Sequence, residues 1–289
     1  MSVDIFQEKI RKTKNPSVLE LAPLFSELPA QLQNRDPAEA CGEFCMELLG
    51  RLRGIIPAVR VSYASFSLLG PEGMSVMQRV LSAAKEAEYY VLLDAPELLS
   101  PRTASMAAQY LLGEGSAFPC DGLVIGGYLG SDVIKPFLEY CRSGKDIFVV
   151  TRTANKSAPE LQDLLTGSRL VHGAAADHVN RYGADTGGKF GYTRVGILAA
   201  ASAADSLRSL RAKYPKLFIL IDGYDYPSAN AKNCSFAFDK YGHGAAVCAC
   251  TGICNAWQQA GSDGSDYLEA ASDAAERMKK NITRYVTVL

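Results

Sequence analysis

The sequence predicts a single (β/α)8 TIM barrel domain that spans residues 1–289. The length of 289 residues suits an eight-stranded α/β barrel, which typically needs about 250. Short apolar runs alternate with longer amphipathic stretches, as they do in proteins built on a parallel sheet. Eight such units follow one another with no linker that would mark a second domain. This favours a closed barrel over an open, doubly wound sheet.

Each expected element has a sequence signal of its own. Eight apolar runs have the length of buried strands: Ser17–Leu21, Ala58–Ser62, Tyr90–Asp94, Gly122–Gly126, Ile147–Thr151, Val195–Ala199, Leu217–Ile221 and Ala245–Ala249. The stretches between them have helical spacing of apolar residues. The expected helices are Pro37–Arg53, Gly73–Ala87, Thr103–Leu112, Asp132–Cys141, Ala158–Leu165, Ala203–Lys213 and Tyr267–Asn281.

Composition and charge exclude several classes of function. Hydrophobic residues make up 48% of the chain and charged residues 21%, as in a globular protein with a large core. The net charge is −1, so no basic surplus points to nucleic acid. No apolar run approaches the about 20 residues that cross a membrane, and the N-terminal residues lack the apolar core of a signal peptide. We therefore expect a cytoplasmic protein with no nucleic-acid or membrane partner.

Eight cysteines in a reducing compartment are expected to stay as thiols. They are Cys41, Cys45, Cys120, Cys141, Cys234, Cys248, Cys250 and Cys254. The last three are close in sequence and, with Cys234, are candidates for a metal site, but the paired C-x2-C spacing of zinc ribbons is missing. We favour buried thiols that pack as small apolar side chains, and we expect no metal.

Two long connections mark the place where a ligand is expected. They cover residues 172–193 and 223–244, and the second follows the seventh strand. In barrels, the loops after strands seven and eight often bind phosphate because backbone N–H groups converge there. No common nucleotide-binding, metalloprotease or hydrolase motif is present. The three histidines, His172, His178 and His243, are scattered along the chain.

Several segments, in the same order along nearly the whole chain, resemble the long bacterial class of orotidine 5′-phosphate decarboxylases. Residues 126–138, GGYLGSDVIKPFL, are similar to the family's "N-P-Y-L-G-x-D…P-F" loop after strand four. Residues 148–155, FVVTRTAN, are similar to its "V-x-x-R-T-S-N" segment at strand five. Residues 69–73, LGPEG, and 238–245, FDKYGHGA, match the segments after strand two and before strand eight.

The resemblance implies a reaction and also a loss of the residues that perform it. The family removes carbon dioxide from orotidine monophosphate to give uridine monophosphate in pyrimidine biosynthesis, and it uses no cofactor. Its alternating Asp-Lys-Asp-Lys array crowds the substrate carboxylate, and a lysine stabilises and protonates the resulting carbanion. Carried over to this sequence, the five family positions that hold the acids and lysines of strands one to three become Ala22, Arg60, Asp94, Pro96 and Leu99. Asp94 is the one member that is kept, and Pro96 has no ionisable group with which to donate a proton.

The ligand-binding motifs are also altered. The family's "P-G-x-G-A-Q-G" segment reads DGYDYPS at residues 222–228, and its "S-R-G" reads Cys250-Thr251-Gly252, so the phosphate-binding arginine becomes Thr251. Loss of a bidentate arginine removes a contact worth about 1.5–3 kcal/mol. The remaining ligand-binding candidates are Tyr128, Asp132, Arg152, Thr153, Asn155, Thr251 and Gly252. Two of them also suit roles that need no ligand, since Asp132 is placed to cap a helix that begins near Val133 and a buried Arg152 would hold loops together.

Three interpretations remain open at this stage. The barrel is a catalytically inactive or altered paralogue that binds a nucleotide, a phosphate or a protein; or a genuine decarboxylase with a rearranged site; or a different enzyme on the same scaffold. We expect Arg60 and Asp94 to form an ion pair that remains from the array. If decarboxylase activity survives, these two are the expected catalytic residues of this protein. The resemblance also implies a homodimer, with Leu98 and Leu99 packed near the subunit interface.

Overall fold

The computed structural model describes residues 2–98 and 100–289 and contains a closed barrel of eight parallel strands. In chain order these are β1 (Ser17–Leu21), β2 (Ala58–Ser62), β3 (Tyr90–Asp94), β4 (Gly122–Gly126), β5 (Asp146–Val150), β8 (Thr193–Ala200), β9 (Leu217–Asp222) and β10 (Ala245–Ala249). Each strand pairs with its neighbours in the chain, and β1 closes the barrel against β10. The expected fold class is confirmed. Five of the eight strands have the predicted bounds, and the ends of the other three differ from the prediction by one or two residues.

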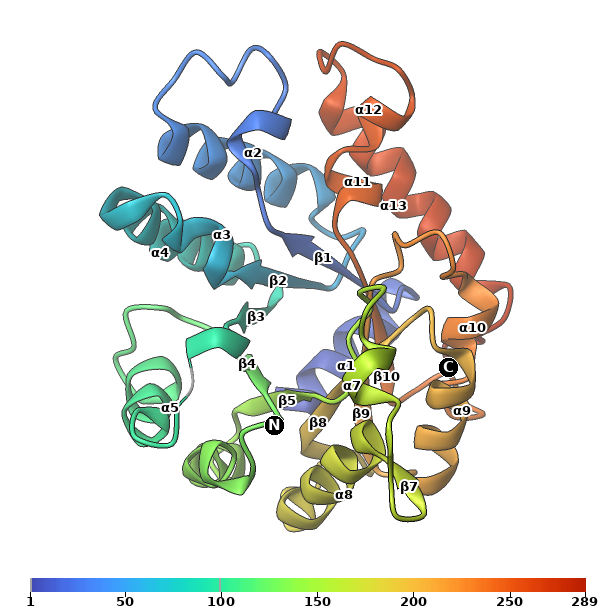
Figure 1. Ribbon diagram of the computed structural model, residues 1–289. Helices are drawn as coiled ribbons and strands as arrows, with labels where there is room; N and C mark the ends of the chain where they lie inside the picture. Colours follow the sequence, from blue (N-terminus) through green and yellow to red (C-terminus); the bar gives the residue numbers. More distant parts are fainter. Residues whose placement is uncertain (1, 99) are drawn as a thin grey trace.

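Helices surround the strands (Figure 1). They are α1 (Ser2–Thr13), α2 (Pro37–Leu52), α3 (Tyr63–Ser67), α4 (Gly70–Glu86), α5 (Ala104–Leu112), α6 (Leu138–Arg142), α7 (Pro159–Gln162), α8 (Val171–Gly183), α9 (Ala204–Lys213), α10 (Ala231–Ser235), α11 (Thr251–Cys254), α12 (Ala256–Gln259) and α13 (Tyr267–Thr283). A short hairpin of β6 (Leu165–Thr166) and β7 (Arg169–Leu170) follows α7. In the described part of the chain, no helix has the length and apolar character needed to cross a membrane.

The N-terminal helix α1 closes one end of the barrel. Phe6 is fully buried, and its ring stacks on Tyr90 at 4.2 Å and on Phe218 at 5.2 Å between centroids. Phe218 in turn meets Phe148 in a T-shaped contact, with 5.9 Å between centroids. Gly196 leaves room for the Phe148 ring, because a Cβ there would lie 2.9 Å from the Cδ1 atom of that ring. Aromatic side chains fill this end of the barrel interior, so we expect a ligand site at the opposite end, where the strands finish.

Two predicted helices are wrong in part. The segment Asp132–Cys141 is not one helix; it forms 3-10 turns at Ser131–Val133 and Lys135–Phe137 before α6 begins. Pro136 explains the break, since it lacks an N–H and disfavours helical backbone in the residue before it. The segment Ala158–Leu165 is helical only over α7, and the chain then enters the β6–β7 hairpin, where Gly167 has φ +66°.

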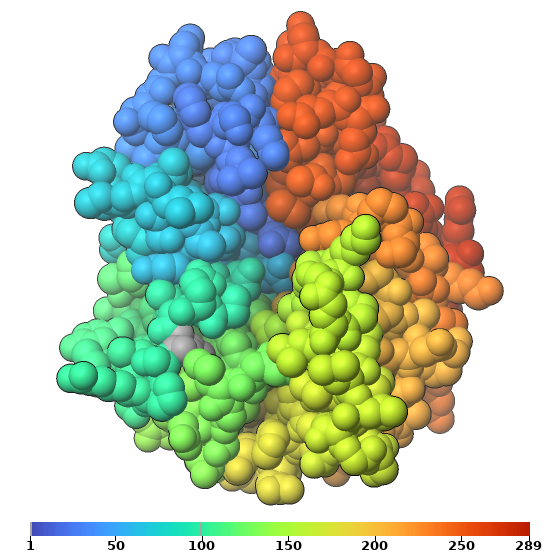
Figure 2. Space-filling model, in the orientation of Figure 1, coloured from blue at the N-terminus to red at the C-terminus, as the bar shows by residue number. Residues whose placement is uncertain are grey.

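The long connections contain more structure than the sequence predicted. Residues 172–193 hold most of α8, and residues 223–244 hold α10, which Asn230 caps by accepting a hydrogen bond from the Asn233 N–H. The α7 segment lies in front of the barrel strands in Figure 1, while α1 lies behind them. On the face shown in Figure 2, this yellow-green segment lies beside the green loops that follow β3 and β4.

Candidate functional site

A buried arginine lies at the centre of the open end of the barrel. Arg60 on β2 is 4% exposed. Its Nη2 atom is 2.7 Å from Glu20 Oε2 and 2.8 Å from Asp222 Oδ1, and its Nε is 3.5 Å from Asp94 Oδ2. The predicted pairing of Arg60 with Asp94 is confirmed, but the guanidinium is shared with two further carboxylates that the sequence interpretation did not include.

The strand geometry explains why these four side chains meet. Asp94 and Asp222 are the last residues of β3 and β9, and the ends of parallel strands lie at the same end of a barrel. Glu20 is paired in register with Arg60 across β1 and β2. Glu20 lies within β1, and Ala22 directly follows the end of that strand. The acid at position 20 thus comes from the strand that leads to Ala22.

The cluster holds more negative than positive charge. Three carboxylates against one guanidinium leave a formal charge of −2 when all are ionised. Burial raises the pKa of Glu20, Arg60 lowers it, and Asp222 and Asp94 raise it again, so that it stands at about 7. Burial also raises the pKa of Asp94 against the opposing effect of Arg60. Glu20 is therefore partly protonated near neutral pH.

Arg60 itself keeps its proton. Burial alone would lower its pKa, but Asp94, Glu20 and Asp222 together raise it well above its usual value. A guanidinium so stabilised is a fixed positive charge and cannot act as a proton donor.

A pocket of about 340 Å³ opens beside this cluster. It is lined by Glu20, Arg60, Asp222, Gly223, Asp225, Tyr226, Pro227, Cys248, Cys250 and Thr251. The ends of β9 and β10 supply most of these residues, which is where the sequence predicts a ligand. No lysine is among the described residues that line the pocket, so Arg60 is the cation there.

The Asp225 carboxylate lies against the backbone N–H groups that follow β10. Asp225 Oδ2 accepts a hydrogen bond from the Cys250 N–H at 2.5 Å. A Cβ at Gly252 would lie 2.2 Å from Asp225 Oδ1, so only glycine permits this close approach. Burial raises the pKa of Asp225, and the N–H groups of Cys250 and Gly252 lower it. The place where a barrel commonly binds phosphate is filled here by the protein's own anion.

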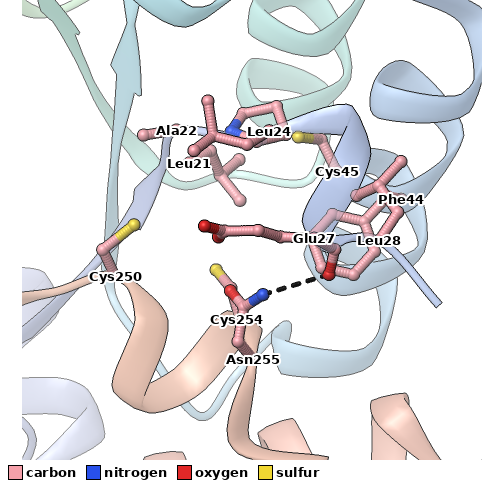
Figure 3. Close-up of a pocket in the computed structure, with 11 residues that line it drawn as sticks. Leu21, Ala22, Leu24, Glu27, Leu28, Phe44, Cys45, Cys250, Cys254 and Asn255 are labelled. Carbon is pink, nitrogen blue, oxygen red and sulfur yellow. Dashed lines mark hydrogen bonds between the residues drawn. The ribbon is translucent and has the colours of Figure 1, made fainter. Parts of the chain in front are cut away.

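A second, narrow pocket lies behind Ala22, between α2, α11 and the 3-10 turn Phe25–Glu27. The Glu27 side chain points between the thiols of Cys250 and Cys254, with Cys45 on the far side (Figure 3). Asn255 Nδ2 donates to the Glu27 carbonyl oxygen at 3.2 Å. The pocket volume of about 10 Å³ is close to the minimum for one water molecule.

The cysteines do not form a metal site in the described part of the chain, where no cluster of three or more Cys, His, Asp or Glu side chains is arranged to bind an ion. All eight are free thiols. Cys234 lies on α10, apart from Cys250 and Cys254, and Cys248 faces Arg60. Burial raises the pKa of Cys248 well above its usual value.

The candidates near β5 form a separate network that fastens α7 to the barrel. Arg152 is 6% exposed, and its Nε and Nη2 donate to Asp163 at 2.9 and 3.0 Å. His172 Nδ1 lies 3.2 Å from the same carboxylate. Thr153 exchanges hydrogen bonds with the Gln162 side chain. The expectation that Arg152 holds loops together is confirmed.

The remaining candidates lie at the surface. Tyr128 donates its hydroxyl hydrogen bond to the Thr151 carbonyl oxygen, and exposed Asn155 accepts one from Thr153. Thr251 is exposed at the start of α11. Asp132 does not cap a helix: it lies within the Ser131–Val133 turn, at which no side-chain cap forms. That prediction is wrong because the segment adopts a 3-10 turn instead of starting an α-helix.

Comparison with known proteins places the chain in a family. It is 30% identical over 250 residues to the orotidine 5′-phosphate decarboxylase of Rhodopirellula baltica, an alignment that covers 82% of this chain and 83% of that protein. The chain belongs to the orotidine 5′-phosphate decarboxylase family. The family enzyme of Clostridium kluyveri is 26% identical over 289 residues, or 98% of each chain. No family model matches the chain.

Solved structures agree on the fold. A Toxoplasma gondii structure aligns with a TM-score of 0.80 at 21% identity and covers 97% of this chain and 98% of its own. The orotidine monophosphate decarboxylase of Leishmania donovani aligns with a TM-score of 0.73 at 23% identity, over 97% of this chain and all of its own. These structures support the fold, and the relative from Rhodopirellula baltica confirms the resemblance to the orotidine 5′-phosphate decarboxylase family.

Sequence reasoning missed three acids of the site. Glu20, Asp222 and Asp225 lie within the motif segments, but their side chains were not predicted to meet Arg60 or the N–H groups after β10. One signal was present for Glu20, a charged residue inside an otherwise apolar strand, which in a buried position needs a partner. Asp225 carried no comparable signal, because its partners are backbone groups 25 residues further along the chain.

Proposed function

We propose that this member of the orotidine 5′-phosphate decarboxylase family does not perform the reaction for which its relatives are named. Those relatives act on orotidine 5′-phosphate in pyrimidine nucleotide synthesis. In this chain, the same end of the barrel forms an acidic pocket suited to other ligands. The observation that carries the proposal is Arg60, held by three carboxylates in the position where the resemblance expects a lysine of the array.

The absence of a suitable proton donor supports the proposal. Decarboxylation leaves a carbanion that must gain a proton, and the resemblance puts Pro96 at the position of the donating lysine. Arg60 keeps its own proton because its carboxylate partners raise its pKa. A missing general acid typically costs about 10²- to 10⁴-fold in rate, and the first acid of the array is also absent at Ala22.

The negative charge of the site independently supports the proposal that this protein does not perform the family's reaction. The substrate of the relatives carries a carboxylate and a phosphate, and the phosphate alone carries about −1.5 to −2 charges near neutral pH. Each negative charge brought to about 4 Å from an unpaired carboxylate costs on the order of 4 kcal/mol at an effective dielectric constant of about 20. Asp225 adds a negative charge at the N–H groups where a phosphate would otherwise bind.

The test compares the purified chain with the Rhodopirellula baltica relative. Orotidine monophosphate is supplied to both, its ultraviolet absorbance is followed, and uridine monophosphate is titrated separately by calorimetry. We expect no turnover above background and no heat of nucleotide binding. Turnover within about tenfold of the relative would establish a genuine decarboxylase with a rearranged site, and binding without turnover would establish a nucleotide-binding paralogue.

We also propose that residues 1–289 act as one barrel domain and that the protein is a cytoplasmic homodimer. Eight free thiols suit a reducing compartment. The dimer is suggested by the family, and the expected packing of Leu98 and Leu99 bears on it, although Leu99 lies outside the described residues. Light scattering at micromolar concentration tests the dimer, and a monomer would contradict it.

A further inference from the structure

The pocket beside Arg60 points to a chemical class of ligand. We propose that it binds a small hydroxylated amine, with the ammonium group on the carboxylates of Glu20 and Asp222 and a hydroxyl oxygen on Arg60. The inference rests on the proposed function, because a site that accepted orotidine monophosphate would have to accept two anionic groups instead.

Two carboxylates that line the pocket converge on the same atom, Arg60 Nη2. Glu20 Oε2 and Asp222 Oδ1 lie 2.7 and 2.8 Å from the same Arg60 nitrogen, so the two oxygens are at most 5.5 Å apart, the sum of these distances. Among the described residues, Arg60 is the one side chain with which each of these carboxylates forms an ion pair or hydrogen bond. Arg60 therefore satisfies one oxygen of each acid, and both acids line the pocket with capacity for a further donor.

Arg60 supplies a second, independent indication. Its Nη1 atom is buried and has no hydrogen-bond partner in the part of the chain that the structure describes, although the residue lines the pocket. Buried donors are nearly always paired in folded proteins, and each unmade bond to a charged group is costly. An acceptor that enters from the pocket would supply the hydrogen bond that Arg60 Nη1 lacks. The ligand therefore needs an oxygen as well as N–H or O–H donors, which a hydroxylated amine provides.

Charge favours a cation over a neutral or anionic ligand. The groups that face Glu20 are Arg60 from β2, Asp94 from β3, Asp222 from β9 and Cys248 from β10. The three acids exceed the single cation, and a proton on Glu20 partly offsets the excess. An ammonium group would take the place of that proton, so binding should release a proton and should tighten as the pH rises from 6 to 8.

The pocket wall suits the carbon chain of such a ligand. Tyr226 is 46% exposed and lines the pocket together with Pro227. The face of a tyrosine ring attracts a cation and also covers the apolar side of a sugar-like chain.

The experiment uses three compounds with the same hydroxylated carbon chain and different charge: glucamine (1-amino-1-deoxysorbitol), sorbitol and gluconate. Each is titrated into the full chain by calorimetry at pH 6 and pH 8, in two buffers of different ionisation heat so that released protons are counted. We expect glucamine to bind with a Kd near or below about 1 mM at pH 8 and at least tenfold more tightly than sorbitol. Gluconate should not bind, and the affinity for glucamine should fall at pH 6.

Substitution of the two pocket acids tests whether glucamine binds in this pocket. Glu20→Gln and Asp222→Asn should each weaken glucamine binding about tenfold or more, and Glu20→Gln should remove the proton release. Asp205→Asn, an exposed acid paired with Arg208 on α9, is the matched control and should leave binding unchanged. If Glu20→Gln proves unstable by circular dichroism, the comparison of the three compounds on the parent chain still decides the matter.

Absence of glucamine binding at about 1 mM, equal binding of sorbitol, or preference for gluconate would overturn the inference. The titration needs no turnover, so its outcome is separate from the decarboxylase assay. Turnover of orotidine monophosphate would overturn the proposed function, whereas failure of glucamine alone would overturn only the ligand class.

Discussion

Replacement of Arg60 by methionine should strongly destabilise the protein near neutral pH. The side chain is 4% exposed and is the cation shared by Glu20, Asp94 and Asp222. Methionine has a similar length but no charge, so Arg60→Met leaves three carboxylates together in a buried site. Removal of one partner of a buried ion pair typically costs about 3–5 kcal/mol. For a domain of this size that corresponds to a fall in Tm of about 6–20 °C, at roughly 2–4 °C per kcal/mol.

The loss should depend on pH in a defined direction. The folded-state pKa of Glu20 is already about 7, above the ordinary value of 4.5, and without Arg60, which lowers it, it must rise further. A carboxyl whose pKa is raised by folding binds its proton more tightly in the folded state, so stability falls as the pH rises above the ordinary value. The difference between Arg60→Met and the parent should therefore be largest at pH 8 and smaller at pH 5.

Urea unfolding followed by circular dichroism at pH 5 and pH 8 measures both effects. Arg79→Met is the matched control, because Arg79 pairs with Glu39 on the surface with about half of each side chain exposed, and such pairs contribute about 0–1 kcal/mol. A loss of less than about 1 kcal/mol for Arg60→Met at pH 8, or an equal loss at both pH values, would refute the electrostatic account of the site.

Three further predictions follow from the same contacts. Glu20→Gln should remove the decline in stability between about pH 5 and pH 7 that the raised pKa of Glu20 produces, and a flat profile in the parent would contradict this. Asp225→Ala should cost about 1–3 kcal/mol in urea unfolding, because it leaves the Cys250 N–H without its acceptor, and it should raise affinity for uridine monophosphate; an unchanged titration would show that Asp225 does not oppose phosphate. Arg152→Met should lower the free energy of unfolding by about 1.5–3 kcal/mol and should speed proteolysis near α7. Cleavage at the parental rate would refute the role of Arg152 in holding α7 against the barrel.

The strands were predictable because each one is a short apolar run with its own boundaries. Gly122–Gly126 and Ala245–Ala249, for example, are bounded by polar or glycine residues on at least one side, and local burial alone decides where they lie. Helix α1 was missed because charged residues interrupt Val3, Phe6 and Ile10, which repeat at helical spacing and are all buried. The break before α6 depends on Pro136, whose effect on the backbone outweighs the helical spacing of the apolar residues around it.

The site was predictable only where one residue implied the next. Arg60 inside an apolar strand required an acid, and Asp94 at the end of the adjacent strand was the available one. The contribution of Asp222 depends on closure of the barrel, which brings β9 across from β2, and no local pattern reports that distance. Asp225 binds backbone N–H groups, which nearly every residue has, so its partner cannot be read from side-chain types.

The central claim is that a barrel of this family has kept its shape and lost the family's reaction. Release of labelled carbon dioxide from carboxyl-labelled orotidine monophosphate tests it most directly, with enzyme in excess over substrate so that a single slow turnover is detected. The structure predicts release no faster than in buffer alone, because Arg60 cannot give up a proton and Asp225 fills the place for phosphate. Release whose rate rises with the concentration of the protein would contradict the claim.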